Sequence, residues 1–118
     1  MSTVTKGRRS RSGRWIYAPA TGKLTCSEDM LRIFGFDPEA GVPTNEQFDE
    51  RVHPDDRDRH AEAVTRALRD NVEYVDNYRI VLPDGTVKYI RESCRPVTSA
   101  SGEVELVGTS VEVRERKR

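Results

Sequence analysis

Apolar residues recur along this 118-residue chain with two different spacings, and the spacing changes near residue 72. Between residues 56 and 69 they recur at helical spacing, at Ala61, Val64, Ala67 and Leu68. From residue 72 onward apolar and polar residues alternate in three runs, residues 72–82, 86–97 and 104–113. Because alternation is typical of strands, the pattern predicts one amphipathic helix followed by three consecutive strands.

Turn residues separate the predicted strands. Thr21-Gly22 lies between two short β-prone runs, residues 15–17 and 24–25, and this arrangement predicts a hairpin near the start of the chain. Pro83-Asp84-Gly85 joins the first two of the later strands, and residues 98–102 join the last two. The chain therefore contains five predicted strands, two before the long helix and three after it.

Two short helices are predicted between the halves of the sheet. Ser27 can cap a helix that runs to Phe34, and the apolar residues of that segment cover too much of its circumference for a surface helix. Thr44 can cap a second helix at residues 45–51, which buries Phe48. The predicted fold class is α+β, with a five-stranded antiparallel sheet and the helices on one face.

Composition restricts the function classes. The length fits one domain, and the formal net charge is zero. Residues 1–14 nevertheless contain five basic residues and no acid, so we expect residues 1–13 to be a disordered basic tail or linker. Nucleic-acid binding is not favoured, because a DNA-binding surface usually requires a basic folded face.

Cysteine usage and hydropathy indicate the compartment. Cys26 and Cys94 are too few for a disulfide framework and lack the spacing of a metal site, so we interpret both as free thiols. No apolar run approaches the ~20 residues of a membrane helix. These features predict a cytoplasmic protein that does not contact a membrane.

Several segments, in order and at the usual spacing, resemble the PAS sensory domain with its C-terminal PAC strands. The resemblance is to the PAS fold-3 type found in bacterial sensor histidine kinases and diguanylate cyclases. The matching segments are Trp15-Ile16-Tyr17 with Thr21-Gly22, Arg32-Ile33-Phe34-Gly35, Val52-His53-Pro54-Asp55-Asp56-Arg57, Tyr78-Arg79-Ile80 with Pro83-Asp84-Gly85, and Val107-Gly108-Thr109. The resemblance implies a sensory domain at residues 14–114 and the start of an output linker at residues 115–118.

The resemblance implies a signal-input function in a two-component or cyclic-nucleotide pathway, without catalysis. In the family, the sheet and the short helices enclose a pocket for a small ligand, and the last strand passes the signal to an effector domain. The residues expected at the pocket are Phe34, Phe48, His60, Val64, Tyr78, Ile80, Ile90, Glu92 and Ser110. Signal output is expected at Glu112, Val113 and Arg114, where the family commonly has Asp, an apolar residue and Thr.

Two alternative functions remain open. A ligand-free homodimer would form through aromatic residues on the other sheet face, where we expect Trp15 or Tyr17 together with Tyr89 and Val87. A haem-based gas sensor would use His60, which matches the axial histidine of a related PAS branch. A photoactive flavin is not expected, since neither cysteine lies in the setting that it requires. Apart from the haem alternative, we expect no cofactor, and the sequence does not identify one.

Polar residues near the predicted pocket have structural interpretations as well. A buried Glu92 requires a partner, and we expect Arg32 to pair with it in preference to a polar ligand. His53 is interpreted as part of the turn before the long helix, not as a metal ligand. Asp55 and Asp56 are adjacent, which suits capping of that helix better than paired acid–base catalysis.

Overall fold

The structure, a computed structural model, describes residues 11–113 of the chain. Expectations for most of the basic tail, for Arg114 and for residues 115–118 therefore lie outside the described residues. Strands and helices follow one another in the predicted order, with two additional 3₁₀ turns, η1 (Pro38–Ala40) and η2 (Pro54–Asp56). The elements are β1 (Ser12–Ala18), β2 (Lys23–Cys26), α1 (Glu28–Ile33), α2 (Asn45–Arg51), α3 (Arg57–Asp70), β3 (Tyr74–Val81), β4 (Val87–Thr98) and β5 (Val104–Val113).

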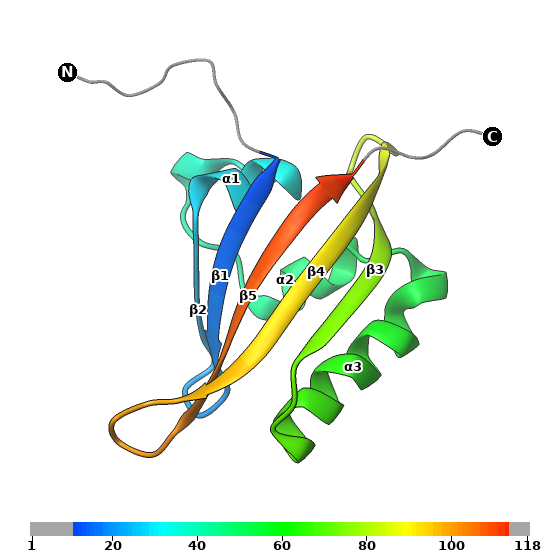
Figure 1. Ribbon diagram of the computed structural model, residues 1–118. Helices are drawn as coiled ribbons and strands as arrows, with labels where there is room; N and C mark the ends of the chain where they lie inside the picture. Colours follow the sequence, from blue (N-terminus) through cyan, green and yellow to red (C-terminus); the bar gives the residue numbers. More distant parts are fainter. Residues whose placement is uncertain (1–10, 114–118) are drawn as a thin grey trace.

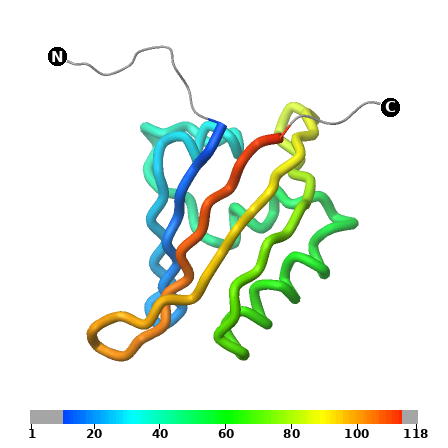
Figure 2. The backbone as a smooth tube through the Cα atoms, viewed as in Figure 1, coloured from blue at the N-terminus to red at the C-terminus, as the bar shows by residue number. Residues whose placement is uncertain are grey.

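The strands form one antiparallel sheet in the order β2-β1-β5-β4-β3. The first and last strands of the chain are neighbours, so β5 lies in the middle of the sheet. All three helices come between β2 and β3, and they lie on one side of the sheet (Figure 1). The tube in Figure 2 shows the same path, from the hairpin through the helices to the three long strands. This arrangement confirms the predicted α+β fold.

Local signals determine where the helices begin and end. The Ser27 hydroxyl accepts a hydrogen bond from the backbone N–H of Met30 at the start of α1. Thr44 and Gln47 form a reciprocal capping box at the start of α2, which has the predicted bounds. Asn71 ends α3 in the left-handed conformation, with φ 57°. The ends of the helices are thus marked by capping residues next to them in the sequence.

The core lies between the sheet and the helices. Phe34, at the end of α1, is 2% exposed and packs edge-on against Phe48 of α2, with ring centroids 5.1 Å apart. On the sheet, the indole of Trp15 lies over Gly108 of the neighbouring strand. A Cβ atom at Gly108 would come within 2.1 Å of that indole, so only glycine fits beneath the ring.

Asp56 has a different role from the one predicted. It occupies the cap position of α3 but makes no capping hydrogen bond with its side chain. Its carboxylate instead accepts hydrogen bonds from the backbone N–H of Arg79 at 2.8 Å and from the guanidinium of Arg79 at 2.8 and 3.0 Å. These bonds hold the pKa of Asp56 well below its usual range. The carboxylate therefore fastens the start of α3 to β3.

Truncation of Phe34 tests the packing of α1. Phe34→Ala should lower the free energy of unfolding by about 3–5 kcal/mol, because the removed ring leaves a cavity in the core. Urea unfolding measures the loss. Val42→Ala is the control, since Val42 is 53% exposed and its truncation should change stability by less than about 0.5 kcal/mol. Equal unfolding midpoints for Phe34→Ala and wild type would contradict the packing.

The Asp56–Arg79 contact should make stability depend on pH. Because folding lowers the pKa of Asp56, its contribution is complete above the unfolded value of about 3.9 and is lost as pH falls below that value. Asp56→Asn should therefore cost about 2–3 kcal/mol at pH 7, and the difference from wild type should shrink below pH 4. Urea titrations of both proteins at pH 7 and below pH 4 measure this difference in the free energy of unfolding. A difference that does not change with pH would contradict the ionic contact.

Candidate functional site

A cavity of about 410 Å³ lies between the inner face of the sheet and the helices. Residues from both halves of the chain line it. Six of the lining residues have large aromatic side chains: Trp15, Tyr17, Phe34, Phe48, Tyr74 and Tyr78. The volume falls within the range of about 300–1,000 Å³ that is usual for small-molecule sites.

A buried carboxylate belongs to the sheet side of this cavity. Glu92 of β4 is 3% exposed, and its two oxygens accept hydrogen bonds from three hydroxyl groups. Tyr74 donates at 2.5 Å and Tyr78 at 2.6 Å. Ser110 donates at 3.1 Å, and its own oxygen accepts from the indole N–H of Trp15 at 3.2 Å. Strands β1, β3, β4 and β5 all contribute to this network.

His60 brings α3 into the same network. Its Nδ1 lies 3.2 Å from a carboxylate oxygen of Asp76, and its Nε2 lies 3.9 Å from a carboxylate oxygen of Glu92. Asp76 and Glu92 are directly opposite each other on β3 and β4. Like charges in that position repel, so the imidazole between them separates the two carboxylates and can neutralise one of them when it is protonated.

Burial and the charge of Glu92 determine the protonation of the nearby groups. Burial, and then the Glu92 charge, raise the pKa of Tyr74 and of Tyr78 well above the usual range, so both phenols remain protonated donors. The same two causes raise the pKa of Cys94 to about 12. Burial also raises the pKa of Cys26, which lines the cavity. Both cysteines are free, as predicted, and both are held as unreactive thiols.

The structure brings together most of the residues expected at a pocket. Six of them line the cavity: Phe34, Phe48, His60, Val64, Tyr78 and Glu92. Ile80, Ile90 and Ser110 face the same side of the sheet and are buried, but they lie in the core and do not line the cavity. The predicted pocket residues did not include Tyr74, which lines the cavity, or Asp76, which contacts His60. Strand alternation from Tyr78 places both on the inner face.

One predicted ion pair and one predicted sheet face are wrong. Arg32 does not pair with Glu92: it lies on the outer surface of α1 and forms ion pairs with Glu28 and Asp29, both at 3.0 Å. Trp15 and Tyr17 do not lie on the outer face of the sheet, since both line the cavity. The pairing of Trp15 with Gly108 turns the indole inward, because that glycine leaves the space it needs.

The residues present do not fit a haem bound through His60. One ring nitrogen contacts Asp76, and the other faces the Glu92 carboxylate at 3.9 Å, where an iron ion would have to lie. Among residues 11–113, no cluster of three or more His, Cys, Asp or Glu side chains could hold a metal ion. His53 accepts a hydrogen bond from the N–H of Asp55 through Nδ1, which confirms its role in the turn.

The outer face of the sheet carries exposed apolar side chains. No described helix covers this face (Figure 1). Its exposed apolar side chains come from β1, β3 and β4: Ile16 at 40%, Val75 at 61%, Val87 at 45% and Val97 at 38%.

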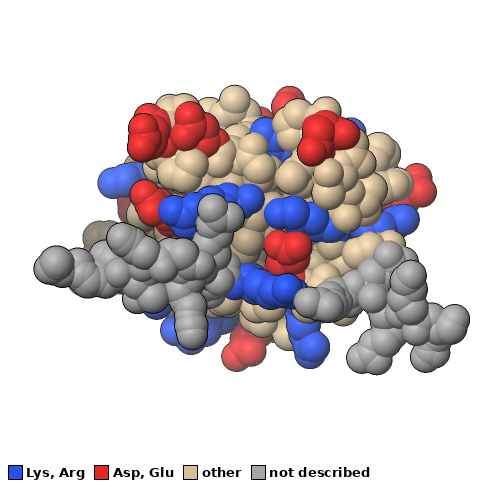
Figure 3. All heavy atoms as spheres, turned by 90° about the horizontal axis from the view of Figure 1, so that it is seen from above, with Lys and Arg blue, Asp and Glu red and all other residues tan. Residues whose placement is uncertain are grey.

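At the end of the molecule drawn in Figure 3, basic side chains lie in small groups among acidic and uncharged ones. In the described part of the chain, no helix is long and apolar enough to span a membrane.

Solved structures show where this architecture occurs. A sensory box histidine kinase/response regulator from Burkholderia thailandensis is 26% identical, with a TM-score of 0.72 over 88% of this chain and 78% of that chain. The N-terminal domain of a diguanylate cyclase with PAS/PAC sensor from Marinobacter aquaeolei is 22% identical, with a TM-score of 0.74 over 86% and 94% of the two chains. A Drosophila melanogaster Cycle PAS-B domain with bound ethylene glycol is 15% identical, with a TM-score of 0.68 over 86% and 99%.

Sequence comparison gives the family directly. No functionally curated protein matches the chain. The family model described as PAS fold matches residues 23–110, which extend from β2 into β5 and include both the helices and the buried carboxylate. Because this match covers most of the chain, the chain belongs to the PAS fold family of sensory domains.

Proposed function

We propose that this PAS domain is a signal-input module that binds a small molecule in its cavity and relays the binding to an effector. The observation that carries the proposal is the cavity itself. It combines about 410 Å³ of space, an aromatic wall and a few buried polar groups. This combination is the usual character of a ligand site, and a domain of this size does not need such a space in order to fold.

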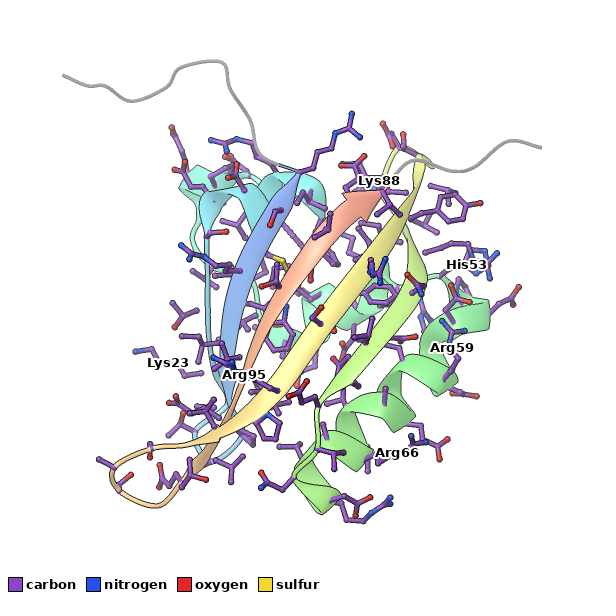
Figure 4. All side chains as sticks on the ribbon, viewed as in Figure 1. Lys23, His53, Arg59, Arg66, Lys88 and Arg95 are labelled. Atoms are coloured by element: carbon purple, nitrogen blue, oxygen red, sulfur yellow. The ribbon has the colours of Figure 1, made fainter. Side chains whose placement is uncertain are left out.

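A polar contact links the wall of the cavity to the last strand. Lys88 of β4 donates a hydrogen bond to the carbonyl of Ile33, at the end of α1, at 2.9 Å. The same ammonium lies 3.5 Å from the carboxylate of Glu112 in β5. Figure 4 shows Lys88 near the end of the sheet where β5 stops. Because Met30 and Phe34 of the α1 region line the cavity, a ligand that moves α1 also perturbs Lys88 and Glu112.

The proposed relay gives a role to Glu112, where the last strand departs from the family pattern. Glu112 is longer than the Asp that the family commonly has there, and its carboxylate reaches Lys88 from the central strand. Its backbone N–H also donates to the carbonyl of Arg11 at 2.8 Å, which joins the ends of β1 and β5. Val113 is the last described residue, so an output role for Arg114 lies outside the described residues. Binding would act by shifting the population between two packings of this end.

A second candidate function is homodimerisation through the outer face of the sheet. The exposed Ile16, Val75 and Val87 favour it, since apolar groups on an open sheet face are typical of a contact surface. Such a dimer would place the outer faces of two sheets against each other and leave both cavities open. Sedimentation velocity decides this candidate, which fails if the protein remains monomeric at high concentration.

Filling the cavity tests ligand binding. A metabolite library should contain a compound that raises the melting temperature of the wild type, by about 10 °C or more at a hundredfold excess over its Kd. Val64→Phe should weaken that compound at least tenfold, because the larger ring occupies the cavity. Ala40→Phe is the control, since Ala40 is exposed and does not line the cavity. Equal affinities for wild type and Val64→Phe would contradict binding at this site.

Removing the Lys88 ammonium tests the relay. Lys88→Met should retain ligand affinity within about threefold, but it should abolish the ligand-dependent change in hydrogen exchange at the Glu112 amide. The Met side chain preserves the apolar packing of the stem and removes the contacts to Ile33 and Glu112. Lys23→Met, near the opposite end of the sheet, is the control (Figure 4). A ligand-dependent change of the same size in Lys88→Met would contradict the relay.

A further inference from the structure

The side chains that line the cavity are unbalanced in charge. Three carboxylates line it, those of Asp49, Asp58 and Glu92. The only basic lining residues among those described are Arg57 and His60. A small molecule that enters this cavity therefore meets more negative than positive charge.

Both basic groups are already engaged by the protein. Arg57 donates from Nε to the carbonyl of Val52 at 3.0 Å and from Nη2 to the carbonyl of Glu50 at 3.1 Å. His60 is held at Nδ1 by Asp76. These bonds use two of the five N–H donors of the Arg57 guanidinium. One guanidinium and one imidazole still face three carboxylates, so the lining favours a cationic ligand over an anionic one.

The aromatic wall offers ring surface more than hydrogen-bond donors. Tyr74 and Tyr78 both donate their hydroxyl groups to Glu92, and the Trp15 N–H is donated to Ser110. What remains available on these three residues is the π surface of their rings. The faces of aromatic rings attract cations, most strongly where the cation is desolvated.

The acidic groups have capacity for one more donor. A carboxylate has about four acceptor positions, and Glu92 uses three of them for hydroxyl groups. Asp49 of α2 lines the cavity and is exposed, so we place it at the mouth of the cavity. Its pKa is raised, chiefly by partial desolvation; His60 opposes this effect, and the charges of Glu46 and Glu92 add to it. A cation between Asp49 and Glu92 would stabilise the buried charge of Glu92 and the exposed charge of Asp49.

We propose that the ligand of this cavity is an organic cation, an ammonium group on a small apolar or aromatic body. The ammonium lies between Glu92 and Asp49, and the body packs against the aromatic wall. This inference rests on the proposed function, because it assumes that the cavity binds a small molecule. It goes further in naming the charge of that molecule and the two carboxylates that select it.

Three probes with the same phenylethyl body and different end groups test the charge. Isothermal titration at pH 7 compares phenethylamine, 2-phenylethanol and 3-phenylpropionate, which are cationic, neutral and anionic. Phenethylamine should bind at least tenfold more tightly than either of the others, because only it supplies a positive charge to the two carboxylates.

Two variants locate the effect. Glu92→Gln should weaken phenethylamine at least tenfold, since it removes the charge with little change of shape. Asp49→Asn tests the mouth independently, because Asp49 is exposed and its change leaves the buried network intact should Glu92→Gln fail to fold. Glu39→Gln is the matched control, an exposed carboxylate that does not line the cavity, and it should bind as wild type does.

The outcomes separate this inference from the proposed function. Equal or tighter binding of the alcohol or the carboxylate would overturn the cation assignment and leave the receptor function standing. Unchanged phenethylamine affinity in Asp49→Asn and in a folded Glu92→Gln would also overturn it. Absence of binding by all three probes overturns the inference too. The receptor function is then decided by the metabolite library and by the effect of Val64→Phe on the compound that it yields. Selective binding of phenethylamine, lost in the carboxylate variants, supports both.

Discussion

The carboxylate of Glu92 is almost entirely buried, and its charge must be stabilised largely by donors from the protein itself. Tyr74, Tyr78 and Ser110 supply them from the two strands that flank β4. Each donor has to lie on the inner face at the correct register, so this one group constrains how three strands pair. The same hydroxyl groups are then unavailable to a ligand, which leaves a cavity wall of ring surfaces and a single buried negative charge.

The helices that close the cavity are fastened to the sheet by polar contacts at its two sides. On one side, Asp56 binds Arg79, and His60 contacts Asp76, so α3 is joined to β3. On the other side, Lys88 joins the end of α1 to the sheet. Because such contacts are directional, the helices are held at defined points while the space between them stays open. That space is the cavity, and residues of both α3 and the α1 region line it.

Much of the fold follows from signals that span a few residues. Alternation in the later strands, the caps at Ser27 and Thr44, and the turn at Pro83-Asp84-Gly85 all predicted elements that the structure contains. The inner face of β3 and β4 followed from the same alternation, so Tyr78 and Glu92 were placed correctly on it. The partners of these residues did not follow, because partners come from other elements.

The sequence by itself determined the elements, their order and which residues of the long strands share a face, since each depends on neighbours along the chain. Only the tertiary structure decided which way Trp15 points and what stabilises Glu92. Trp15 and Ser110 are 95 residues apart, and the face of a three-residue β-prone run depends on its pairing with β5. Arg32 pairs within α1, because carboxylates one turn away reach it without the desolvation that a buried ion pair requires.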